Sequence, residues 1–443
     1  MLVDRARSQC TNRDTTKPMR TWRIVALTTV ALAAAACSTS STTTTMTTVH
    51  VGTSRTTTTT TAHGRTSTTL PSTPVVIRTT PPRPGSRCGN YKVVLRPGTT
   101  VPGVYLAALE VLSRTTAIGV TQSEIYCSTG PGGGGFEAFP AWLVVSTDGG
   151  RVWRTTGSQL PRALNTVGTL AFSSSDRGWL DASSNLAFTA NGGRSWQVVR
   201  LDGAVESLAS DGRYVAALAV NSLGNTARVW RLSATSTHRE PEPVLHSPTR
   251  SQWSLMAVLP RSGDIVVYFQ PFQGSAPLYV IDMSQSQWRT TTMPSCLHGE
   301  FDSLVGTSED TLATICSLGD VGMRHEPKAF FLSVNGGRTW QRRSAALNPG
   351  GPDPSGIPPF VLMTLAASSP TTYYMATIDE VSVSSDAGRT WTQLAIGNAA
   401  AGGAVGAAFS FVDPEHGWLL IPGAALLRTT DGRLWTALDT APL

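Results

Sequence analysis

A short motif occurs five times between residues 146 and 435 and constrains the fold more than any other feature. It reads [Ser/Thr]-x-[Asp/Asn]-x-Gly-x-x-Trp, and the fifth copy lacks one residue between Asp and Trp. In this spacing Asp or Asn accepts hydrogen bonds from backbone N–H groups just ahead, and Gly supplies the positive φ of a tight hairpin turn. Trp then starts the next strand and buries its ring. The Asp or Asn and the Trp of the five copies are Asp148 and Trp153, Asn191 and Trp196, Asn335 and Trp340, Asp386 and Trp391, and Asp431 and Trp435.

The flanking sequence makes each copy part of a larger unit. Apolar runs at 141–145 and 328–332 precede two of the turns and predict strands. In two units a Gly-Trp pair, at Trp179 and at Trp418, precedes the motif and predicts a further strand. Each unit thus reads as strand, turn, Gly-Trp strand, strand, motif turn, strand. This order predicts a four-stranded antiparallel blade.

Two further Trp residues extend the series. If Trp230 and Trp288 mark degenerate copies of the motif, seven Trp positions follow one another at intervals of 34 to 58 residues, where propeller blades take roughly 40 to 50 residues. A single blade leaves both faces uncovered, so such repeats close into a ring. We expect an all-β, seven-bladed β-propeller that starts near Val104. Six or eight blades remain compatible with the sequence, because two of the seven rest on weak matches.

The segment before the repeats has the features of an exported lipoprotein. A basic start after Met19 precedes a short apolar run at 24–36, which is typical of a signal peptide and short for a membrane helix. The run ends in a sequence that resembles a bacterial lipobox, with Ala34 where Leu is usual, and Cys37 is the candidate lipidated residue. Ordinary cleavage near Ala36 is the alternative.

Thr, Ser and Pro dominate the next fifty positions and predict a disordered tether. The expected organisation is a signal peptide at 1–37, with Met19 as an alternative start, a tether at 38–87 and the propeller at 88–443. We expect the mature protein on the outer face of the cytoplasmic membrane, held there by the lipid anchor. A secreted form is the alternative.

The basic charge of the chain is concentrated ahead of the propeller. Of the formal net charge of +6, residues 1–37 contribute +4 and residues 38–87 contribute +5, which leaves −3 for residues 88–443. Because the propeller itself is mildly acidic, nucleic acid is not an expected partner.

Four cysteines follow the candidate anchor: Cys88, Cys127, Cys296 and Cys316. An even number in an exported domain predicts disulfides, for which three connectivities exist. Proximity in sequence favours Cys88–Cys127 and Cys296–Cys316. Free buried thiols are the alternative.

The repeated motif resembles the Asp-box, or bacterial neuraminidase, repeat of sialidases, sortilin-type receptors and xyloglucan-cleaving endoglucanases. The combination of a Gly-Trp strand with this box is most similar in pattern to the photosystem II stability and assembly factors and their bacterial relatives. The resemblance covers roughly residues 104–440 and implies the propeller fold. It says little about function, because the box is a structural turn in all of these families.

An enzymatic function finds weak support. A sialidase would carry an Arg-Ile-Pro type motif before its first box, and the nearest Arg here, Arg114 in Ser-Arg-Thr-Thr, does not match it. Asp181 and Asp413 lie beside the two Gly-Trp strands and are the candidates for the paired carboxylates of a glycosidase; turn residues are the alternative. We expect a non-catalytic protein or, failing that, a glycosidase. His, Glu and Asp alternate over 298–302, but a solvated loop is the expectation there, and no metal or cofactor is predicted.

The longest connecting segments lie away from the motif turns. Residues 128–140 fall between the second and third strands of the first blade, and residues 234–252, 341–359 and 397–404 are expected between blades. Both kinds of connection belong to the rim opposite the motif turns. Binding residues favour loops on a rigid scaffold, so we expect that rim of a monomeric propeller to bind a cell-surface protein or glycan, or to assemble a membrane complex; untuned loop variation is the alternative. Its polar candidates are Arg239, Glu240, His298, Glu300, Arg342 and Arg343.

Overall fold

The computed structural model describes much of the chain between Val76 and Asp439. The described residues are 76–80, 90–94, 98–101, 106–121, 124–128, 134–138, 141–161, 164, 167–182, 185–211, 213–221, 226–246, 251–259, 262–271, 277–282, 287–294, 300–308, 310–317, 326–346, 354–360, 362–377, 380–394, 396, 407–422 and 425–439. Among them there is no helix that could cross a membrane. The predicted signal peptide, Cys37, Cys88, Cys296 and His298 lie outside these residues.

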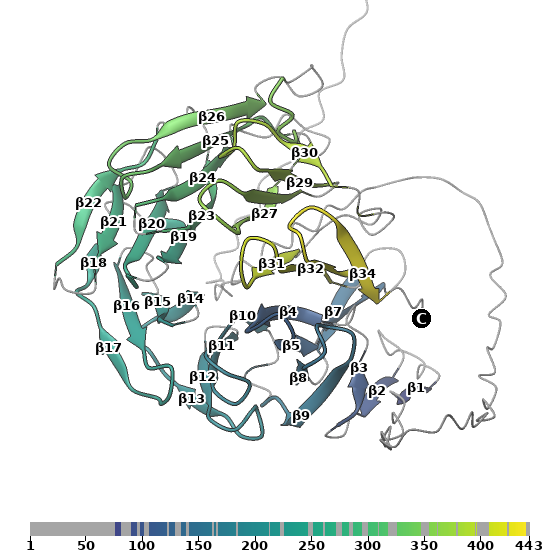
Figure 1. Cartoon of the computed structure of the whole chain (residues 1–443). Coiled ribbons are helices and arrows are strands. Elements are labelled where there is room, and N and C mark those ends of the chain that lie inside the picture. The colour runs from purple at the N-terminus through teal and green to yellow at the C-terminus, as the bar shows by residue number, and fades with distance from the viewer. Residues whose placement is uncertain are drawn as a thin grey trace, which may run out of the picture.

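Seven antiparallel sheets stand around a common axis as the blades of a propeller, which confirms seven blades over six or eight (Figure 1). Blade 1 holds β4 (Leu106–Val111), β5 (Ala117–Thr121), β8 (Trp142–Ser146) and β9 (Trp153–Gln159), with β3 (Thr100–Val101) outside β9. Blade 2 holds β10 (Val167–Phe172), β11 (Gly178–Ala182), β12 (Asn185–Thr189) and β13 (Gln197–Val199). Blade 3 holds β14 (Ala204–Ser210), β15 (Val215–Val220), β16 (Thr226–Leu232) and β17 (Arg239–Pro241), and β18 (Leu245–His246) also pairs with β16. Blade 4 holds β19 (Ser251–Val258), β20 (Ile265–Pro271), β21 (Pro277–Ile281) and β22 (Arg289–Thr292).

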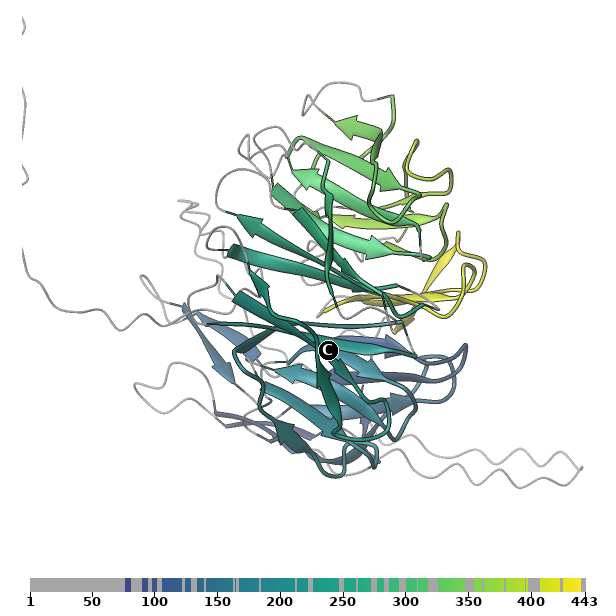
Figure 2. The same cartoon turned by 90° about the vertical axis from the view of Figure 1, so that its left-hand side faces the viewer.

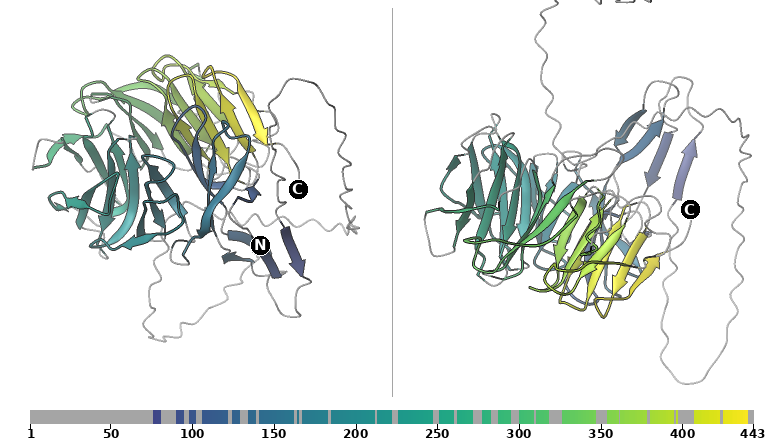
Figure 3. Two further views of the ribbon diagram at one scale, coloured as in Figure 1. Left: turned by 60° about the horizontal axis from the view of Figure 1, so that its bottom comes forward. Right: turned by 90° about the horizontal axis from the view of Figure 1, so that it is seen from above.

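The other three blades repeat this order. Blade 5 holds β23 (Glu300–Gly306), β24 (Leu312–Ser317), β25 (Lys328–Ser333) and β26 (Gln341–Ala346). Blade 6 holds β27 (Leu362–Ala367), β28 (Tyr373–Thr377), β29 (Val381–Ser384) and β30 (Thr392–Gln393). Blade 7 holds β31 (Ala408–Phe411), β32 (Gly417–Ile421), β33 (Ala425–Thr429) and β34 (Trp435–Asp439). The left view of Figure 3 shows the blades obliquely, and the right view shows the ring edge-on with the strands side by side.

The hydrophobic core is divided into seven wedges, one at each interface between successive blades, which we call a seam and number by its two blades. Each seam has its own cluster of buried apolar side chains. The second strand of a blade lies between two seams, so β15 and β32 are buried along their whole length. This explains why such strands read as continuous apolar runs without alternation. Full burial of each Val, Leu or Ile stabilises the fold by about 1.5–3 kcal/mol.

The ring closes through side chains, without exchange of a strand between its two ends. Blades 1 and 7 are each built from one continuous stretch of chain. The first strands β4 and β31 contact each other, as do the first strands of the other successive blades. Across seam 7–1 the hydroxyl oxygen of Ser410 accepts a hydrogen bond from the backbone N–H of Val111 at 3.0 Å. Arg114 also pairs with Asp413 at 3.1 Å.

The structure corrects the predicted position of one repeat. Trp288 precedes β22, as the motif predicts, but Trp230 lies inside β16, the third strand of blade 3. The connection from β16 to β17 holds no Gly and is built on hydroxyl groups: Ser233 Oγ accepts from the N–H of Thr235 at 3.2 Å, and Ser236 Oγ accepts from the N–H of His238 at 3.2 Å. Because the turn chemistry differs, the Trp spacing misplaces this turn.

Two predicted connections are likewise shorter than expected. Within 234–252, residues 239–241 form β17, the fourth strand of blade 3, and within 341–359 residues 341–346 form β26. The segment 128–140 lies between the second and third strands of blade 1 as predicted, and β7 (Gly134–Ala138) there pairs with β6 (Glu124–Ser128).

One short strand lies inside the predicted tether, which otherwise stays a prediction. β1 (Val76–Thr80) falls inside 38–87 and pairs with β2 (Asn90–Val94). Val76 and Ile77 and the following Thr residues are β-branched, and such residues favour strands even in a Thr-rich context.

Candidate functional site

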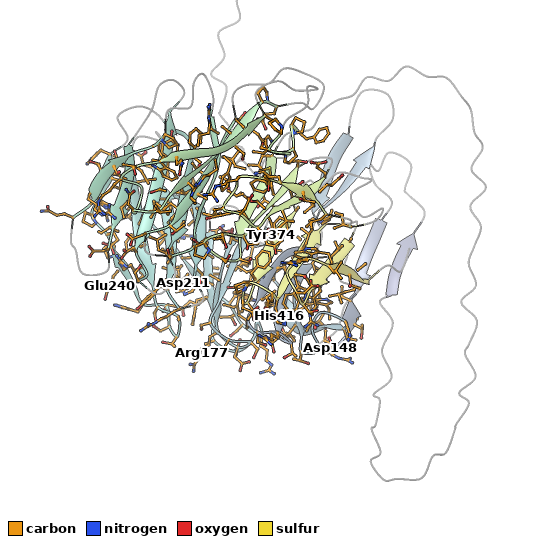
Figure 4. The ribbon with its side chains drawn as sticks, turned by 45° about the horizontal axis from the view of Figure 1, so that its top comes forward. Asp148, Arg177, Asp211, Glu240, Tyr374 and His416 are labelled. Atoms are coloured by element: carbon orange, nitrogen blue, oxygen red, sulfur yellow. The ribbon has the colours of Figure 1, made fainter. Side chains whose placement is uncertain are left out.

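The ring has two rims with different connections. The first-to-second and third-to-fourth connections of every blade lie on one rim, which we call the turn rim; the other connections lie on the opposite rim. In the side view of Figure 2 the blade strands run between these two rims. Figure 4 shows Asp148, Arg177, Glu240 and His416 along the turn rim, whereas Tyr374 lies inside the ring.

The five motif copies form third-to-fourth turns on the turn rim, and their carboxylates and amides hold the backbone. Oδ1 of Asp148 accepts from the N–H groups of Arg151 and Val152 at 3.1 and 3.0 Å. Ser146 Oγ accepts from the N–H of Gly150 at 2.9 Å. The other four copies use their Asp or Asn Oδ1 in the same way. These polar groups are therefore engaged in turn structure.

The last Gly of the motif also seals the seam to the preceding blade. A Cβ on Gly150 would come within 2.7 Å of Leu438 and 2.9 Å of Trp418 in blade 7. A Cβ on Gly388 would come within 2.1 Å of Phe330 in blade 5. Both glycines have positive φ, 87° and 79°. The third-to-fourth connections of blades 3 and 4 carry no such Gly in their sequence.

A pocket opens on the turn rim at seam 3–4, where this sealing Gly is missing. It has a volume of about 220 Å³, and its walls are mostly apolar. Ala216 of β15 and Val258 and Ile265 of blade 4 line its inner part. The polar residues of its lining are Tyr214, Arg231, Ser233, His238 and Glu240.

Charged side chains organise this pocket. Arg231, on β16, pairs through Nε with Glu242, and its Nη atoms donate to the carbonyl oxygens of Gly263 and Asp282 in blade 4, both at 3.3 Å. The guanidinium is thus fixed across the seam with little exposure. His238 Nε2 and Glu240 Oε1 lie 3.2 Å apart and are well exposed. The pocket therefore combines an apolar interior with a charged entrance.

An open polar groove adjoins the pocket and shares His238 with it. The groove is lined by Trp230, Ser236, Thr237, His238 and Arg239. Arg228 and Arg239 place their guanidinium carbons 5.8 and 5.7 Å from the ring centroid of Trp230. Cation–π contact with two arginines orients this indole.

The structure brings together two of the six predicted binding residues. Arg239 and Glu240 line the groove and the pocket from β17, on the turn rim, so their predicted place in a loop of the opposite rim is wrong. Arg342 and Arg343 lie in β26, the outer strand of blade 5, and the backbone of Glu300 starts β23. These three are not in the pocket lining.

The two candidate glycosidase carboxylates lie at opposite rims. Asp413 is in the first-to-second turn of blade 7, and Asp181 is near the end of β11 that leads to the opposite rim. The prediction of a facing pair is therefore wrong. A Gly-Trp strand runs from the turn rim to the opposite rim, so a residue before the strand and a residue at its end lie on different rims.

Their environments differ as well. Burial raises the pKa of Asp181 to about 6, and backbone hydrogen bonds from Thr169 and Gly168 partly offset this. For Asp413 burial acts to raise the pKa, but hydrogen bonds from His416, from the N–H groups of Glu415 and His416, and from Arg114 outweigh it and lower the pKa to about 2. Asp413 thus acts as a turn residue that also reaches blade 1.

One partly buried acid was missed in the sequence. Glu110, on the innermost strand of blade 1, accepts a hydrogen bond from the backbone N–H of Phe172 in blade 2. Burial raises its pKa to about 8, and this hydrogen bond partly offsets the effect. A single Glu in an otherwise apolar strand, Leu-Ala-Ala-Leu-Glu-Val, was the signal that could have identified it.

The predictions about metal binding and about the two disulfides stay predictions. Among the described residues no group of three or more His, Cys, Asp and Glu is placed to hold a metal ion. Cys316 is completely buried in β24, and Cys127 lies in β6. The pairings with Cys296 and Cys88 stay predictions.

No protein-family model and no curated protein matches this chain. Solved structures do match it. "YCF48 bound to D1 peptide" is 17% identical with a TM-score of 0.50, over 79% of this chain and 98% of that one. A GH74 xyloglucanase from Xanthomonas campestris is 14% identical with a TM-score of 0.52, over 78% of this chain and 55% of the enzyme. At these identities the likeness shows the β-propeller fold.

Proposed function

We propose that this protein is an exported, membrane-anchored propeller that acts as a non-catalytic scaffold and binds a protein partner on its turn rim. The observation that carries the proposal is the pocket at seam 3–4, where the motif that closes other seams is missing. Its mostly apolar wall suits a protein side chain better than a glycan, whose hydroxyl groups need many polar partners. A charged entrance around an apolar centre is the usual arrangement of protein interfaces.

Two further considerations support a protein partner. One solved structure with a similar fold is that of YCF48 bound to D1 peptide, in which a β-propeller binds a peptide. The sequence resemblance to assembly factors favours a partner that belongs to a membrane complex. The lipid anchor at Cys37 would hold the propeller beside such a complex, and the tether would set its reach.

The binding proposal is tested by cross-linked capture from the cell envelope with the full chain as bait. Glu240→Ala removes the carboxylate at the pocket entrance, and Asp176→Ala removes an exposed carboxylate elsewhere on the turn rim. We expect capture of a defined partner to fall by about fivefold or more with the first variant and to stay unchanged with the second. Equal capture by both variants would refute this site.

The competing function is that of an extracytoplasmic glycosidase. It is tested by assaying the full chain against a panel of fluorogenic glycosides. We expect no turnover above that of heat-treated protein. Turnover that disappears in Asp181→Asn or in Asp413→Asn would overturn the non-catalytic proposal.

The export proposal includes lipidation of Cys37 and a disulfide at the buried Cys316, since disulfides persist in oxidising compartments. Metabolic labelling with a palmitate analogue in a bacterial host should label the wild type and not Cys37→Ala. Labelling of neither protein, with both in the medium, would favour the secreted alternative.

A further inference from the structure

Three blades place an aromatic ring at the same point of their structure. This point, which we call the seam position, is the second residue of the second strand, and it faces the next blade. Trp179, Tyr374 and Trp418 occupy it in blades 2, 6 and 7. Trp179 Nε1 donates to the carbonyl of Ser233 at 2.7 Å, and Tyr374 Oη donates to that of Gly432 at 2.8 Å. Each ring thus fills its seam and reaches the third-to-fourth connection of the next blade.

Blade 3 has Ala216 at the seam position. The strand register identifies it: Ala216 pairs with Arg231 as Trp418 pairs with Arg428. Ala216 belongs to the buried cluster of seam 3–4 and lines the pocket there. The pocket therefore occupies the space that an aromatic side chain fills at the other three seams.

Blade 5 also has a small residue at the seam position, Ala313, yet its seam is filled. Phe330, on the third strand, supplies a ring that lies 5.4 Å from that of Trp391 and packs against Gly388 of the next blade. The corresponding residue of blade 3 is Val229, since it pairs with Leu218 as Phe330 pairs with Ile315. The second and third strands of blade 3 provide no ring at this seam; Tyr214, directly before β15, packs against the edge of its cluster and lines the pocket.

The arginine partner of the ring is nevertheless present. In blade 7 the Arg428 guanidinium lies 4.9 Å from the ring centroid of Trp418. Arg231 takes the same register position in blade 3 and is held by Glu242 and by two carbonyls of blade 4. A fixed guanidinium beside a ring-sized apolar space favours an aromatic ligand through cation–π attraction.

We propose that this pocket receives the aromatic side chain, Trp or Tyr, of a partner polypeptide, which completes seam 3–4 as Trp418 completes seam 7–1. The inference rests on the proposed function, in that the ligand is a protein. A polypeptide is favoured over a free small aromatic molecule because a second, open groove, lined by Trp230 and Arg239, shares His238 with the pocket at the turn rim. That groove can hold the residues flanking the inserted ring.

The test uses a capped pentapeptide, Gly-Ser-X-Ser-Gly, with 5-fluorotryptophan at X, and free 5-fluoroindole as the second probe. Binding to the full chain is followed by ¹⁹F NMR. The variants are Ala216→Trp, which copies blades 2 and 7, and Ala216→Ile, which copies Ile118 of blade 1. Val334→Trp is the matched control, because it adds an indole at an exposed position of the turn rim.

We expect the dissociation constant of the peptide to rise about tenfold or more in Ala216→Trp, about threefold in Ala216→Ile, and to stay within about twofold of wild type in Val334→Trp. The unfolding midpoint of Ala216→Trp should equal or exceed that of wild type. If Ala216→Trp fails to fold, the Ala216→Ile series decides. The peptide should also bind more tightly than 5-fluoroindole.

Three outcomes would overturn the inference: no binding of the peptide to wild type, binding unchanged by both Ala216 variants, or binding of 5-fluoroindole alone. The proposed function fails differently. If the envelope partner is captured normally by Ala216→Trp, the scaffold function stands and the aromatic pocket falls. If no partner is captured by any variant while the peptide binds wild type alone, the pocket stands and the scaffold function falls.

Discussion

Seams 7–1 and 3–4 are built on the same backbone plan and have opposite outcomes. In seam 7–1 the indole of Trp418 lies under the guanidinium of Arg428 and against the bare backbone of Gly150. In seam 3–4 the arginine is kept, but Ala216 replaces the indole, and a pocket opens. Blade 5 also has an alanine at the seam position, but there Phe330 of the third strand supplies the ring that seam 3–4 lacks.

The largest expected effect comes from exchanging the two seam positions. Trp418 is fully buried, so Trp418→Ala should lower the free energy of unfolding by about 3–5 kcal/mol. Ala216→Trp should change it by about 1 kcal/mol or less, because the space already exists. Chemical denaturation of both variants measures the difference. Equal losses in the two variants would show that the seams are not equivalent.

The sealing glycine should come next. In Gly150→Ala the new Cβ meets Leu438 and Trp418 and the residue keeps a φ of 87°, so we expect a loss of about 2–4 kcal/mol. Gly98→Ala is the control, because Gly98 has a similar φ of 81° but no atom within 4 Å of the added Cβ. Its loss should be about 1 kcal/mol. Similar melting shifts for both would assign the cost to φ alone.

Seam 1–2 contains a titratable group, Glu110, that bonds to the backbone of the next blade. The folded state holds the proton of Glu110 up to about pH 8, whereas the usual pKa is 4.5. The unfolding free energy of the wild type should therefore be highest below pH 4.5 and fall between pH 4.5 and about 8, as the unfolded state releases its proton. Glu110→Gln removes this dependence and should gain on the order of 2 kcal/mol over the wild type at the upper end. A constant difference from pH 4 to pH 8 would contradict the burial of this acid.

The smallest effect is expected at the outside of seam 7–1. The Arg114 side chain is 62% exposed and pairs with Asp413 over 3.1 Å. Arg114→Ala should therefore cost about 0.5 kcal/mol or less, and added salt should reduce the difference further. Denaturation at low and high ionic strength measures it. A loss comparable to that of Trp418→Ala would mean that this ion pair, and not the indole, closes the ring.

The fold could be predicted in detail because its signal is local and repeated. A turn motif such as Asp148 to Trp153 specifies its own hydrogen bonds, so five copies fix five third-to-fourth turns without any knowledge of neighbouring blades. This prediction from local sequence fails in blade 3. The third-to-fourth turn there uses hydroxyl groups in place of the motif, and Trp230 lies in the third strand instead of at the start of the fourth. The placement of Arg239 and Glu240 went wrong for the same reason.

The candidate site could not be predicted because it depends on a missing side chain. Nothing marks Ala216 in the sequence until the strand register aligns it with Trp179 and Trp418. The Gly-Trp signature was visible in two units, and its absence after Tyr214 was the available clue. The pairing of Asp181 with Asp413 failed because both residues are near a Gly-Trp strand in the sequence but at different ends of it. Asp413 precedes its strand, and Asp181 is near the far end of its strand.

Closure by side chains also makes one seam of the ring mechanically weaker than the others. The backbone passes from blade to blade at six seams, and seam 7–1 is the one that no connection crosses in the described chain. A pull between the first strand of blade 1 and the last strand of blade 7 would therefore load Trp418, Ser410 and the Arg114–Asp413 pair before any backbone ladder. Under tension the contacts between blades 7 and 1 should separate first. Seam 3–4, on the opposite side of the ring, should separate last.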